Sequence, residues 1–299
     1  MRGRGARCLP AAPGGLGPAL LEKVDGRPAR GEKWRVASPP APPPPSRRLR
    51  IGRLELDPLA LEEALDAIEA LVLAGRGGAV FTPNVDHVVK AERDAELRAA
   101  YAGADLALAD GMPLVWASRL LGAPLPERVA GSDLVAPLAA RAARRGWGLY
   151  LLGGAPGDAA RAAEVLARDP GVRIAGVDAP ALDLSPAGAE ACRAAAERVR
   201  AARPDLVYVG LGAPKQELWI HRHLELLRPA VVLGVGASLA FVAGTVPRAP
   251  RWMSRAGLEW LHRLSREPRR LWRRYLVEDA AFAPILLRTW WERRAERGG

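Results

Sequence analysis

Short apolar runs alternate with longer Ala- and Arg-rich stretches through residues 51–242, and this alternation restricts the fold more than any other feature. The candidate strands are residues 51–56, 79–82, 106–109, 148–152, 173–177, 206–209 and 231–235. The candidate helices are residues 58–74, 86–101, 112–121, 131–145, 157–168, 186–202, 215–227 and 237–242. Strands that follow one another through helices run parallel, and the helices then cover both faces of the sheet. The sequence therefore predicts an α/β fold with a mostly parallel, Rossmann-like sheet.

Charge divides the chain into three segments. The formal net charge of +11 is the sum of +8 in residues 1–50, −4 in residues 51–246 and +7 in residues 247–299. Residues 1–48 contain 10 of the 27 prolines and show no apolar period, which predicts a disordered extension. We therefore expect an α/β domain over residues 49–246, followed by a basic helical appendage over residues 247–299.

The appendage combines arginine with aromatic residues at helical spacing. It contains five of the nine tryptophans, namely Trp252, Trp260, Trp272, Trp290 and Trp291. This composition is typical of a helix that lies in an anionic membrane interface. An amphipathic helix packed on the body is the simpler alternative. A nucleic-acid-binding surface is a third alternative, but it would leave the loops of the acidic domain without a role, so we expect no nucleic acid partner.

The sequence lacks the usual features of an exported or membrane-spanning protein. Cys8 and Cys192 are too few for a disulfide scaffold or a four-cysteine zinc site. No apolar core of the signal-peptide type follows the basic residues 1–7. The longest charge-free apolar stretch, residues 229–247, is rich in Gly, Ala and Ser, and we do not expect it to span a membrane. We expect a cytoplasmic location, and the sequence leaves open whether the chain forms a homo-oligomer.

Glycine-rich and polar segments follow the predicted strands, where parallel sheets bind their ligands. These segments are Thr82-Pro83-Asn84-Val85-Asp86, Asp110-Gly111-Met112-Pro113, Gly153-Gly154-Ala155-Pro156-Gly157, Gly210-Leu211-Gly212-Ala213-Pro214-Lys215-Gln216-Glu217 and Gly236-Ala237-Ser238. Glycine-rich loops that open helices offer backbone N–H groups to phosphate. Each loop alone is most often only a turn, but several on one sheet edge favour a nucleotide-type ligand. No segment has the full dinucleotide fingerprint, which disfavours a Rossmann oxidoreductase.

Asp110 has two interpretations. An aspartate just before a helix is a common N-cap, and Pro113 in the first turn agrees with that. A carboxylate at a strand end can also act as a general base. The local sequence alone favours the cap.

No residues are spaced to hold a metal ion. The chain has no Asp-x-Asp pair near a predicted strand end, and His221 and His223 diverge on a predicted helix. We therefore expect no metal site and no cofactor. If a diphosphate leaves here, arginines and helix N-termini would have to stabilise it.

A set of motifs in a fixed order resembles one family. These motifs are Thr82-x-Asn84, Ala109-Asp110-Gly111-Met112-Pro113, Glu127-Arg128-Val129-x-Gly131, Gly212-x-Pro214-Lys215-Gln216-Glu217, Gly234-Val235-Gly236-Ala237, Arg248-Ala249-Pro250, Gly257-Leu258-Glu259-Trp260, Arg263-Leu264 and Glu267-Pro268-x-Arg270. Together they are similar to the WecG/TagA/CpsF glycosyltransferases, glycosyltransferase family 26. The resemblance covers about residues 49–276 in order.

The resemblance implies a metal-independent, inverting transfer of a sugar, most often of the N-acetylmannosamine type, from a UDP-sugar. The implied acceptor is N-acetylglucosamine linked to a polyprenyl diphosphate at the cytoplasmic face of the membrane. The enzyme would then act in cell-surface polysaccharide synthesis as a peripheral protein on an anionic membrane surface.

The resemblance also implies roles for single residues. Asp110 would be the catalytic base for the acceptor hydroxyl, which adds the base role to the cap, and Thr82 and Asn84 would line the same pocket. Gln216 would lie near the nucleotide, and Arg128 would be a pocket arginine. The same motifs contribute Gly212, Lys215, Glu217 and Gly236 to substrate binding. The arginines implied to reach the diphosphate when the appendage folds over the site are Arg263, Arg270 and Arg273.

Overall fold

The computed structural model describes residues 48–250, 253, 257–266 and 268–298. The chain divides into one unit of residues 1–38 and another of residues 39–299, and all described residues belong to the second. The predicted disordered extension, residues 1–48, lies outside the described residues except for Arg48.

A parallel sheet of six strands forms the centre of the described chain, in the order β4–β3–β8–β7–β5–β6. Its strands are β3 (Gly78–Phe81), β4 (Leu106–Ala107), β5 (Gly148–Gly153), β6 (Arg173–Asp178), β7 (Leu206–Gly210) and β8 (Val231–Gly234). The predicted α/β fold is confirmed.

Helices cover both faces of this sheet because successive side chains of a strand point to opposite sides. In β3, Ala79 and Phe81 belong to one buried cluster, and Val80 belongs to the other. The first cluster is covered by α2 (Val85–Ala91), α3 (Ala95–Ala102), α7 (Ala189–Ala202) and α8 (Lys215–Leu227). The second is covered by α1 (Leu61–Leu73), α5 (Gly131–Arg145), α6 (Asp158–Arg168) and α9 (Ser238–Ala243).

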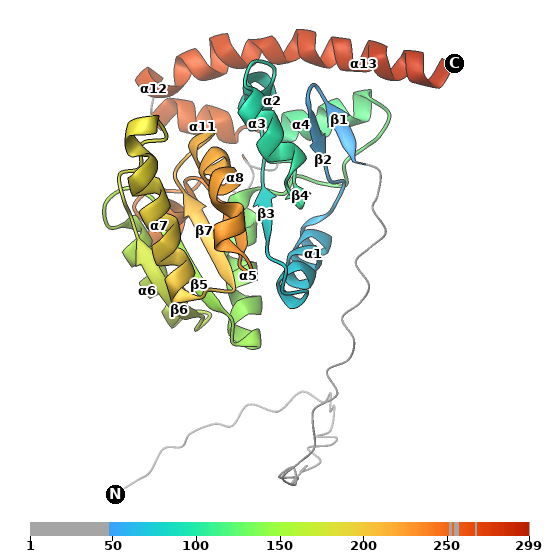
Figure 1. Ribbon diagram of the computed structural model, residues 1–299. Coiled ribbons are helices and arrows are strands. Elements are labelled where there is room, and N and C mark those ends of the chain that lie inside the picture. Colours follow the sequence, from blue (N-terminus) through green and yellow to red (C-terminus); the bar gives the residue numbers. More distant parts are fainter. Residues whose placement is uncertain (1–47, 251–252, 254–256, 267, 299) are drawn as a thin grey trace, which may run out of the picture. The chain divides into compact units, whose positions relative to one another are not determined.

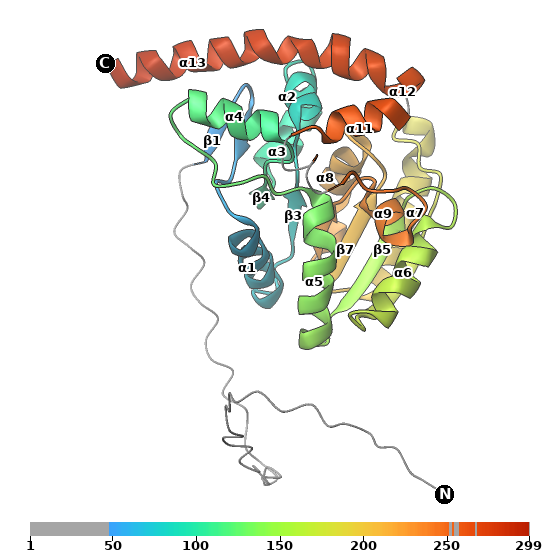
Figure 2. The same cartoon turned by 180° about the vertical axis from the view of Figure 1, so that it is seen from behind.

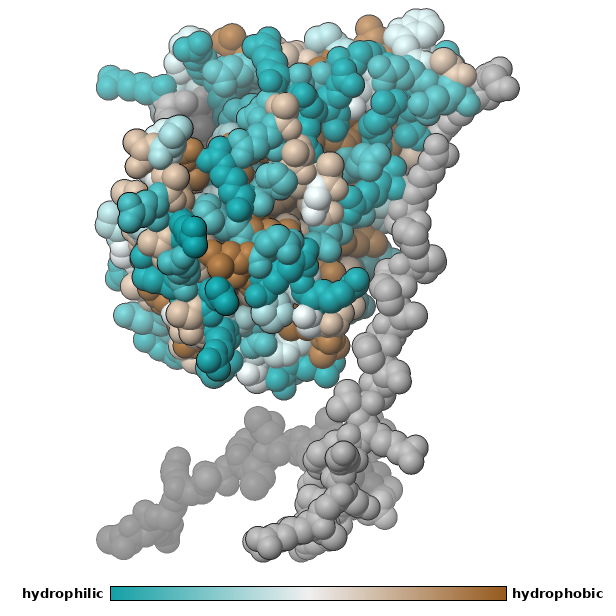
Figure 3. All heavy atoms as spheres, in the orientation of Figure 1, coloured by the Kyte–Doolittle hydropathy of each residue, from teal (hydrophilic) through white to brown (hydrophobic). Residues whose placement is uncertain are grey.

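The two views of the ribbon show these layers from opposite sides. Figure 1 shows α7 and α8 in front of the sheet, and Figure 2 shows α5, α6 and α9 on the opposite face. The surface over α7 and α8 is largely hydrophilic (Figure 3), as expected for helices that bury only one side. Within the described residues, no helix is both long and apolar enough to span a bilayer.

The prediction of a single strand over residues 51–56 is wrong. These residues belong to an antiparallel hairpin of β1 (Leu49–Ile51) and β2 (Leu54–Leu56), separate from the parallel sheet. The chain turns at Gly52, whose φ of +59° is open to glycine at little cost. The Asp57 carboxylate then accepts a hydrogen bond from the N–H of Ala107, which attaches the hairpin to the edge strand β4.

The predicted helix over residues 86–101 is two helices, α2 and α3. The break comes at Asp94, whose carboxylate accepts a hydrogen bond from the N–H of Leu97 and so caps α3. Asp at an N-cap starts a new helix because its side chain satisfies a free backbone donor.

The C-terminal segment is helical and packs on the α/β body. It consists of α11 (Glu259–Arg266), α12 (Pro268–Arg273), the π-helical turn η2 (Arg274–Glu278), the 3₁₀ turn η3 (Asp279–Ala281) and α13 (Phe282–Gly298). Helix α13 crosses the hairpin and α2 (Figure 1), and the N–H of Gly52 donates a hydrogen bond to the buried Thr289 hydroxyl at 3.0 Å. Arg288 pairs with Glu92 on the same side.

Candidate functional site

The loops after β3 and β4 are joined by backbone hydrogen bonds. The N–H of Asp110 donates to the carbonyl of Pro83 at 2.8 Å, and the N–H of Val129 donates to the carbonyl of Ala109 at 2.9 Å. The first bond continues the pairing of β3 with β4 beyond the ends of the two strands, and the second attaches the segment of Arg128 and Val129 to the loop after β4. They place Asn84, Asp110 and Arg128 around one cavity.

Asp110 is not the cap of the helix that follows it, so the cap interpretation is wrong. Helix α4 (Met112–Leu120) has Gly111 as its N-cap, and no side chain caps that end of the helix. Gly111 has a φ of +140°, a conformation that side chains other than glycine rarely adopt. The helix therefore starts one residue later than an Asp110 cap requires, and the Asp110 carboxylate faces Arg128 at 3.6 Å.

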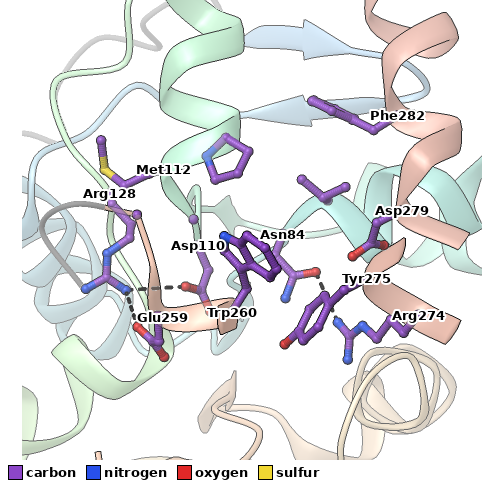
Figure 4. A pocket seen from close by; sticks show the side chains of 14 residues that line it. Asn84, Asp110, Met112, Arg128, Glu259, Trp260, Arg274, Tyr275, Asp279 and Phe282 are labelled. Atoms are coloured by element: carbon purple, nitrogen blue, oxygen red, sulfur yellow. Dashed lines mark hydrogen bonds and ion pairs between the residues drawn. The ribbon is translucent and has the colours of Figure 1, made fainter. Parts of the chain in front are cut away.

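The cavity has a volume of about 320 Å³ and lies between the sheet edge and the C-terminal segment. Its polar lining residues are Asn84, Asp110, Arg128, Glu259, Arg274 and Asp279, and its aromatic ones are Trp260, Tyr275 and Phe282. Figure 4 shows these side chains converging from the α/β body and from the C-terminal helices. A mixture of aromatic walls and a few charged groups is typical of a site for a polar organic ligand.

Arg128 stands among three carboxylates. Its guanidinium lies 2.8 Å from Asp133, and its Nη1 lies 3.6 Å from both Asp110 and Glu259. Arg248 also pairs with Asp133. Because Asp133 belongs to α5, it fixes Arg128 from the body side and leaves the guanidinium oriented toward the cavity (Figure 4).

Arg274 is the second cation of the cavity. Its Nη2 lies 3.1 Å from Asp86 and donates a weak hydrogen bond to Asn84 Oδ1 at 3.5 Å. The buried Asp86 also pairs with Lys90 at 2.8 Å. Arg274 was not among the residues expected from the sequence.

The neighbouring Arg273, which was expected to reach the diphosphate, is 74% exposed and lies 3.5 Å from Glu278. A π-helical turn begins at the next residue, Arg274. The side chains of Arg263 and Arg270 lie outside the described residues.

Asp279 is a further carboxyl of the cavity that the sequence analysis missed. Burial, with the nearby Asp86 as a second cause, raises the pKa of Asp279 to about 6. Its Oδ1 is buried, and no atom of the described part of the chain forms a hydrogen bond with it. Glu259 was part of a quoted motif but was not selected either, and only the folded position of α11 brings it to Arg128.

A second cluster of the expected residues lies at the ends of β7 and β8. The Gln216 side chain accepts a hydrogen bond from the N–H of Gly236 at 2.9 Å and donates one to Glu217 at 2.8 Å. Glu217 is fully buried, so it lies behind the surface that a substrate could touch. Gly212 and Lys215 are at the start of α8, where the carbonyl of Gly212 accepts from the N–H of Gln216.

Thr82 lies between the two clusters. It is buried, and a Cβ added at Gly131 would come within 3.3 Å of its hydroxyl and 3.2 Å of Val235. Thr82 is not among the residues that line the cavity. Among the described residues there is no group of three or more His, Cys, Asp or Glu side chains placed to hold a metal ion.

The model of the glycosyl transferase WecG/TagA/CpsF family matches residues 49–296. The chain belongs to this family. It is 36% identical to the N-acetylglucosaminyldiphosphoundecaprenol N-acetyl-β-D-mannosaminyltransferase of Bacillus spizizenii strain W23 over 202 residues, which is 67% of this chain and 76% of that protein. It is 32% identical to the transferase of the same name from Bacillus subtilis strain 168 over 219 residues, 72% of this chain and 82% of that protein. The chain is a glycosyltransferase, as its sequence motifs predicted.

The raised pKa of Asp279 predicts a pH-dependent stability. Between its ordinary pKa of 3.8 and about 6, the folded protein retains a proton that the unfolded chain releases. The contribution of Asp279 to the free energy of unfolding therefore falls as the pH rises through this range. We expect Asp279→Asn to have a melting temperature close to that of the wild type at pH 4 and above it at pH 7.5.

Scanning calorimetry at both pH values is the measurement. Glu225→Gln is the matched control, because it alters an exposed carboxylate whose pairing with Arg228 contributes little to stability and which does not affect the pKa of Asp279. A difference in melting temperature between Asp279→Asn and the wild type that is the same at both pH values would contradict the prediction.

Proposed function

We propose that this glycosyltransferase moves N-acetylmannosamine from a UDP-sugar to N-acetylglucosamine linked to a polyprenyl diphosphate. The observation that carries the proposal is the position of Asp110, beside Asn84 at the carboxyl edge of the sheet and facing the cavity with its arginines. The names of the two Bacillus transferases supply the sugar and the acceptor.

Asp110 is proposed as the general base. It removes the proton from a hydroxyl of the acceptor sugar while that oxygen attacks the anomeric carbon of the donor. The bond from this carbon to the diphosphate breaks in the same step, and its electron pair leaves with UDP. A single displacement of this kind inverts the anomeric configuration.

Arginines are proposed to stabilise the leaving diphosphate in place of a metal ion. Arg128 and Arg274 already line the cavity, and a planar guanidinium can donate two hydrogen bonds to one phosphate. Arg263, Arg270 and Arg273 remain predicted contributors from the C-terminal segment. Gln216 and Gly236, at the ends of β7 and β8, are the proposed contacts to the nucleotide.

The donor is tested by offering a series of UDP-sugars with a short-chain prenyl diphosphate N-acetylglucosamine acceptor and detecting the product by mass spectrometry. We expect product from UDP-N-acetylmannosamine and an unchanged rate in EDTA. Transfer of another sugar alone would overturn the donor assignment. A rate that EDTA abolishes and added Mg²⁺ or Mn²⁺ restores would overturn metal independence.

The base is tested by comparing two carboxylates at the same distance from Arg128. Asp110→Asn should lower turnover by about 10²–10⁴, with nearly unchanged UDP affinity measured by calorimetry. Its melting temperature should also stay close to that of the wild type, because Asp110 does not cap α4. Glu259→Gln is the matched variant and should keep most of the turnover. A larger loss of turnover in Glu259→Gln than in Asp110→Asn would assign the base to Glu259.

We also propose that the protein docks on the anionic inner face of the cell membrane through the helices around the cavity. Apolar side chains are exposed on α11, α12 and η2, namely Trp260, Leu261, Trp272 and Val277. Trp116 and Leu120 are exposed on α4. This helix lies beside the start of α11 (Figure 2), where Gly257 is close to the Trp116 ring. Exposed arginines on the same segment, Arg266, Arg269 and Arg273, would attract anionic lipid.

The docking proposal predicts that charge in this apolar face weakens binding to liposomes that contain anionic lipid. One buried Leu or Trp side chain is worth about 2 kcal/mol, so Leu261→Glu combined with Trp272→Glu should lower binding at least about tenfold in a sedimentation assay. Leu73→Glu is the control, because Leu73 is exposed at the far end of α1, near the opposite edge of the sheet. Equal losses from the double variant and from the control would contradict the proposal.

A further inference from the structure

A continuous line of polar contacts joins the loop after β3 to the loop after β8. The Nδ1 atom of His87 lies 2.9 Å from the side-chain oxygen of Asn84, and the Nε2 atom lies 3.3 Å from Glu217 Oε1. The same Glu217 oxygen accepts a hydrogen bond from Gln216, whose own oxygen accepts from the N–H of Gly236. Strands β3 and β8 are neighbours in the sheet, so the line crosses between adjacent loops.

The middle of this line is buried. Glu217 is 0% exposed, His87 is 3% exposed and Gln216 is 4% exposed. A buried carboxylate costs free energy unless donors surround it, and His87 and Gln216 both face Glu217 Oε1. Because Nε2 of His87 faces a carboxylate, we assign the proton to this nitrogen, which donates to Glu217. Nδ1 is then an acceptor that binds the backbone N–H of Asn84, and its contact with the Asn84 side-chain oxygen is close packing and not a hydrogen bond.

At one end of the line, His87 holds the backbone of Asn84 through Nδ1. The backbone N–H of Asn84 donates to Nδ1 at 3.2 Å, so His87 closes a capping box at the start of α2. The Asn84 side-chain oxygen also accepts from the N–H of Asp86 at 3.1 Å. With this oxygen engaged, the amide nitrogen is turned away from Arg274, as Figure 4 shows. It is the group that Asn84 can offer to a substrate.

At the other end, the contact fixes a backbone turn. Gly236 follows β8 with a φ of +54°, and its N–H is bound by Gln216 instead of being free. Through Glu217, the orientation of Gln216 depends on the same carboxylate that His87 contacts. We therefore expect a substitution at His87 or Glu217 to alter the positions of both Asn84 and the Gly236 loop.

We propose that His87 and Glu217 are positioning residues that hold the Asn84 amide and the Gly236 loop in one fixed relation. Glu217, expected from the sequence to bind substrate, acts through Gln216 and His87 because it is fully buried. The assignment of Asn84 to the acceptor rests on the proposed function. The coupling of the two loops does not, because it follows from the contacts alone.

The first experiment is a double-mutant cycle between His87 and Asn84. His87→Leu keeps the approximate volume and removes both polar contacts, and small misplacements of reacting groups cost up to about 10²-fold in rate. We expect it to lower kcat/KM for the acceptor about 10- to 100-fold in the wild-type background. In the Asn84→Ala background, His87→Leu should lower kcat/KM for the acceptor less than about threefold, because the Asn84 side chain that His87 positions is then absent. Equal losses in both backgrounds would overturn the proposal.

Two conservative variants separate the ends of the line. His87→Asn can keep a polar atom near the position of Nδ1, and His87→Gln can keep one near the position of Nε2. We expect His87→Leu to lose UDP affinity as well as activity toward the acceptor. Relative to His87→Leu, His87→Asn should regain most of the activity toward the acceptor, and His87→Gln should regain most of the UDP affinity. Restoration of both by either variant would mean that His87 only fills space.

Amide hydrogen exchange on the ligand-free protein tests the coupling without any turnover. His87→Leu should speed exchange in both residues 84–91 and residues 234–240 while α6, at the other side of the sheet, stays as in the wild type. Glu217→Gln, which keeps the shape, should show the same pattern and serves if His87→Leu does not fold. Faster exchange throughout, or in one loop only, would overturn the coupling. If no UDP-sugar is transferred by the wild type, the proposed function fails, and the exchange result still decides the coupling.

Discussion

The hydrogen bond from the N–H of Asp110 to the carbonyl of Pro83 determines the geometry of the candidate site. It extends the pairing of β3 with β4 past the ends of both strands, so the residues that follow them lie side by side. Asn84 and Asp110 are 26 positions apart in the sequence, yet the backbone bond of Asp110 to Pro83, the residue before Asn84, brings them together. Groups held by strand ends move less than groups on long loops, which suits a site that must align two reacting molecules.

The two arginines that line the cavity are both paired with carboxylates. Arg128 faces Asp110, Asp133 and Glu259, and Arg274 faces Asp86. Each arginine thus has partners from the body, and its side chain is already oriented when a ligand arrives. An anionic ligand would meet cations that need little rearrangement, which is the condition for electrostatic stabilisation of a leaving group.

The C-terminal segment has two different relations to the body. Helix α13 is attached to the β1–β2 hairpin and α2 by a buried hydroxyl and by ion pairs such as Arg288 with Glu92. By contrast, α11 to η3 supply Glu259, Arg274 and Asp279 to the cavity and expose Trp260 and Trp272. These helices therefore line the cavity and present apolar side chains next to it, which agrees with the proposed substrates, a diphosphate-linked donor and a lipid-linked acceptor.

The sequence alone predicted the α/β fold and the family, and it selected Asn84, Asp110 and Arg128, which line the cavity in the structure. It could do so because strand periodicity and the motifs after strand ends are local features, and a parallel sheet brings such ends to one edge. The hairpin over residues 51–56 and the position of Gly111, instead of Asp110, as the helix cap became known only from the structure. Both depend on a positive φ at a single glycine, Gly52 or Gly111, which the hydrophobic pattern does not predict.

Packing also separates charged side chains that the sequence does not distinguish. Arg274 lines the cavity and Arg273 is exposed, and burial makes Asp279 a weaker acid. Glu217 belongs to a motif that predicts substrate contact, yet it is buried between α2 and α8. Burial and register depend on neighbours far away in the sequence, so residue type and spacing identify a candidate, and only packing determines whether it faces a ligand or supports one that does.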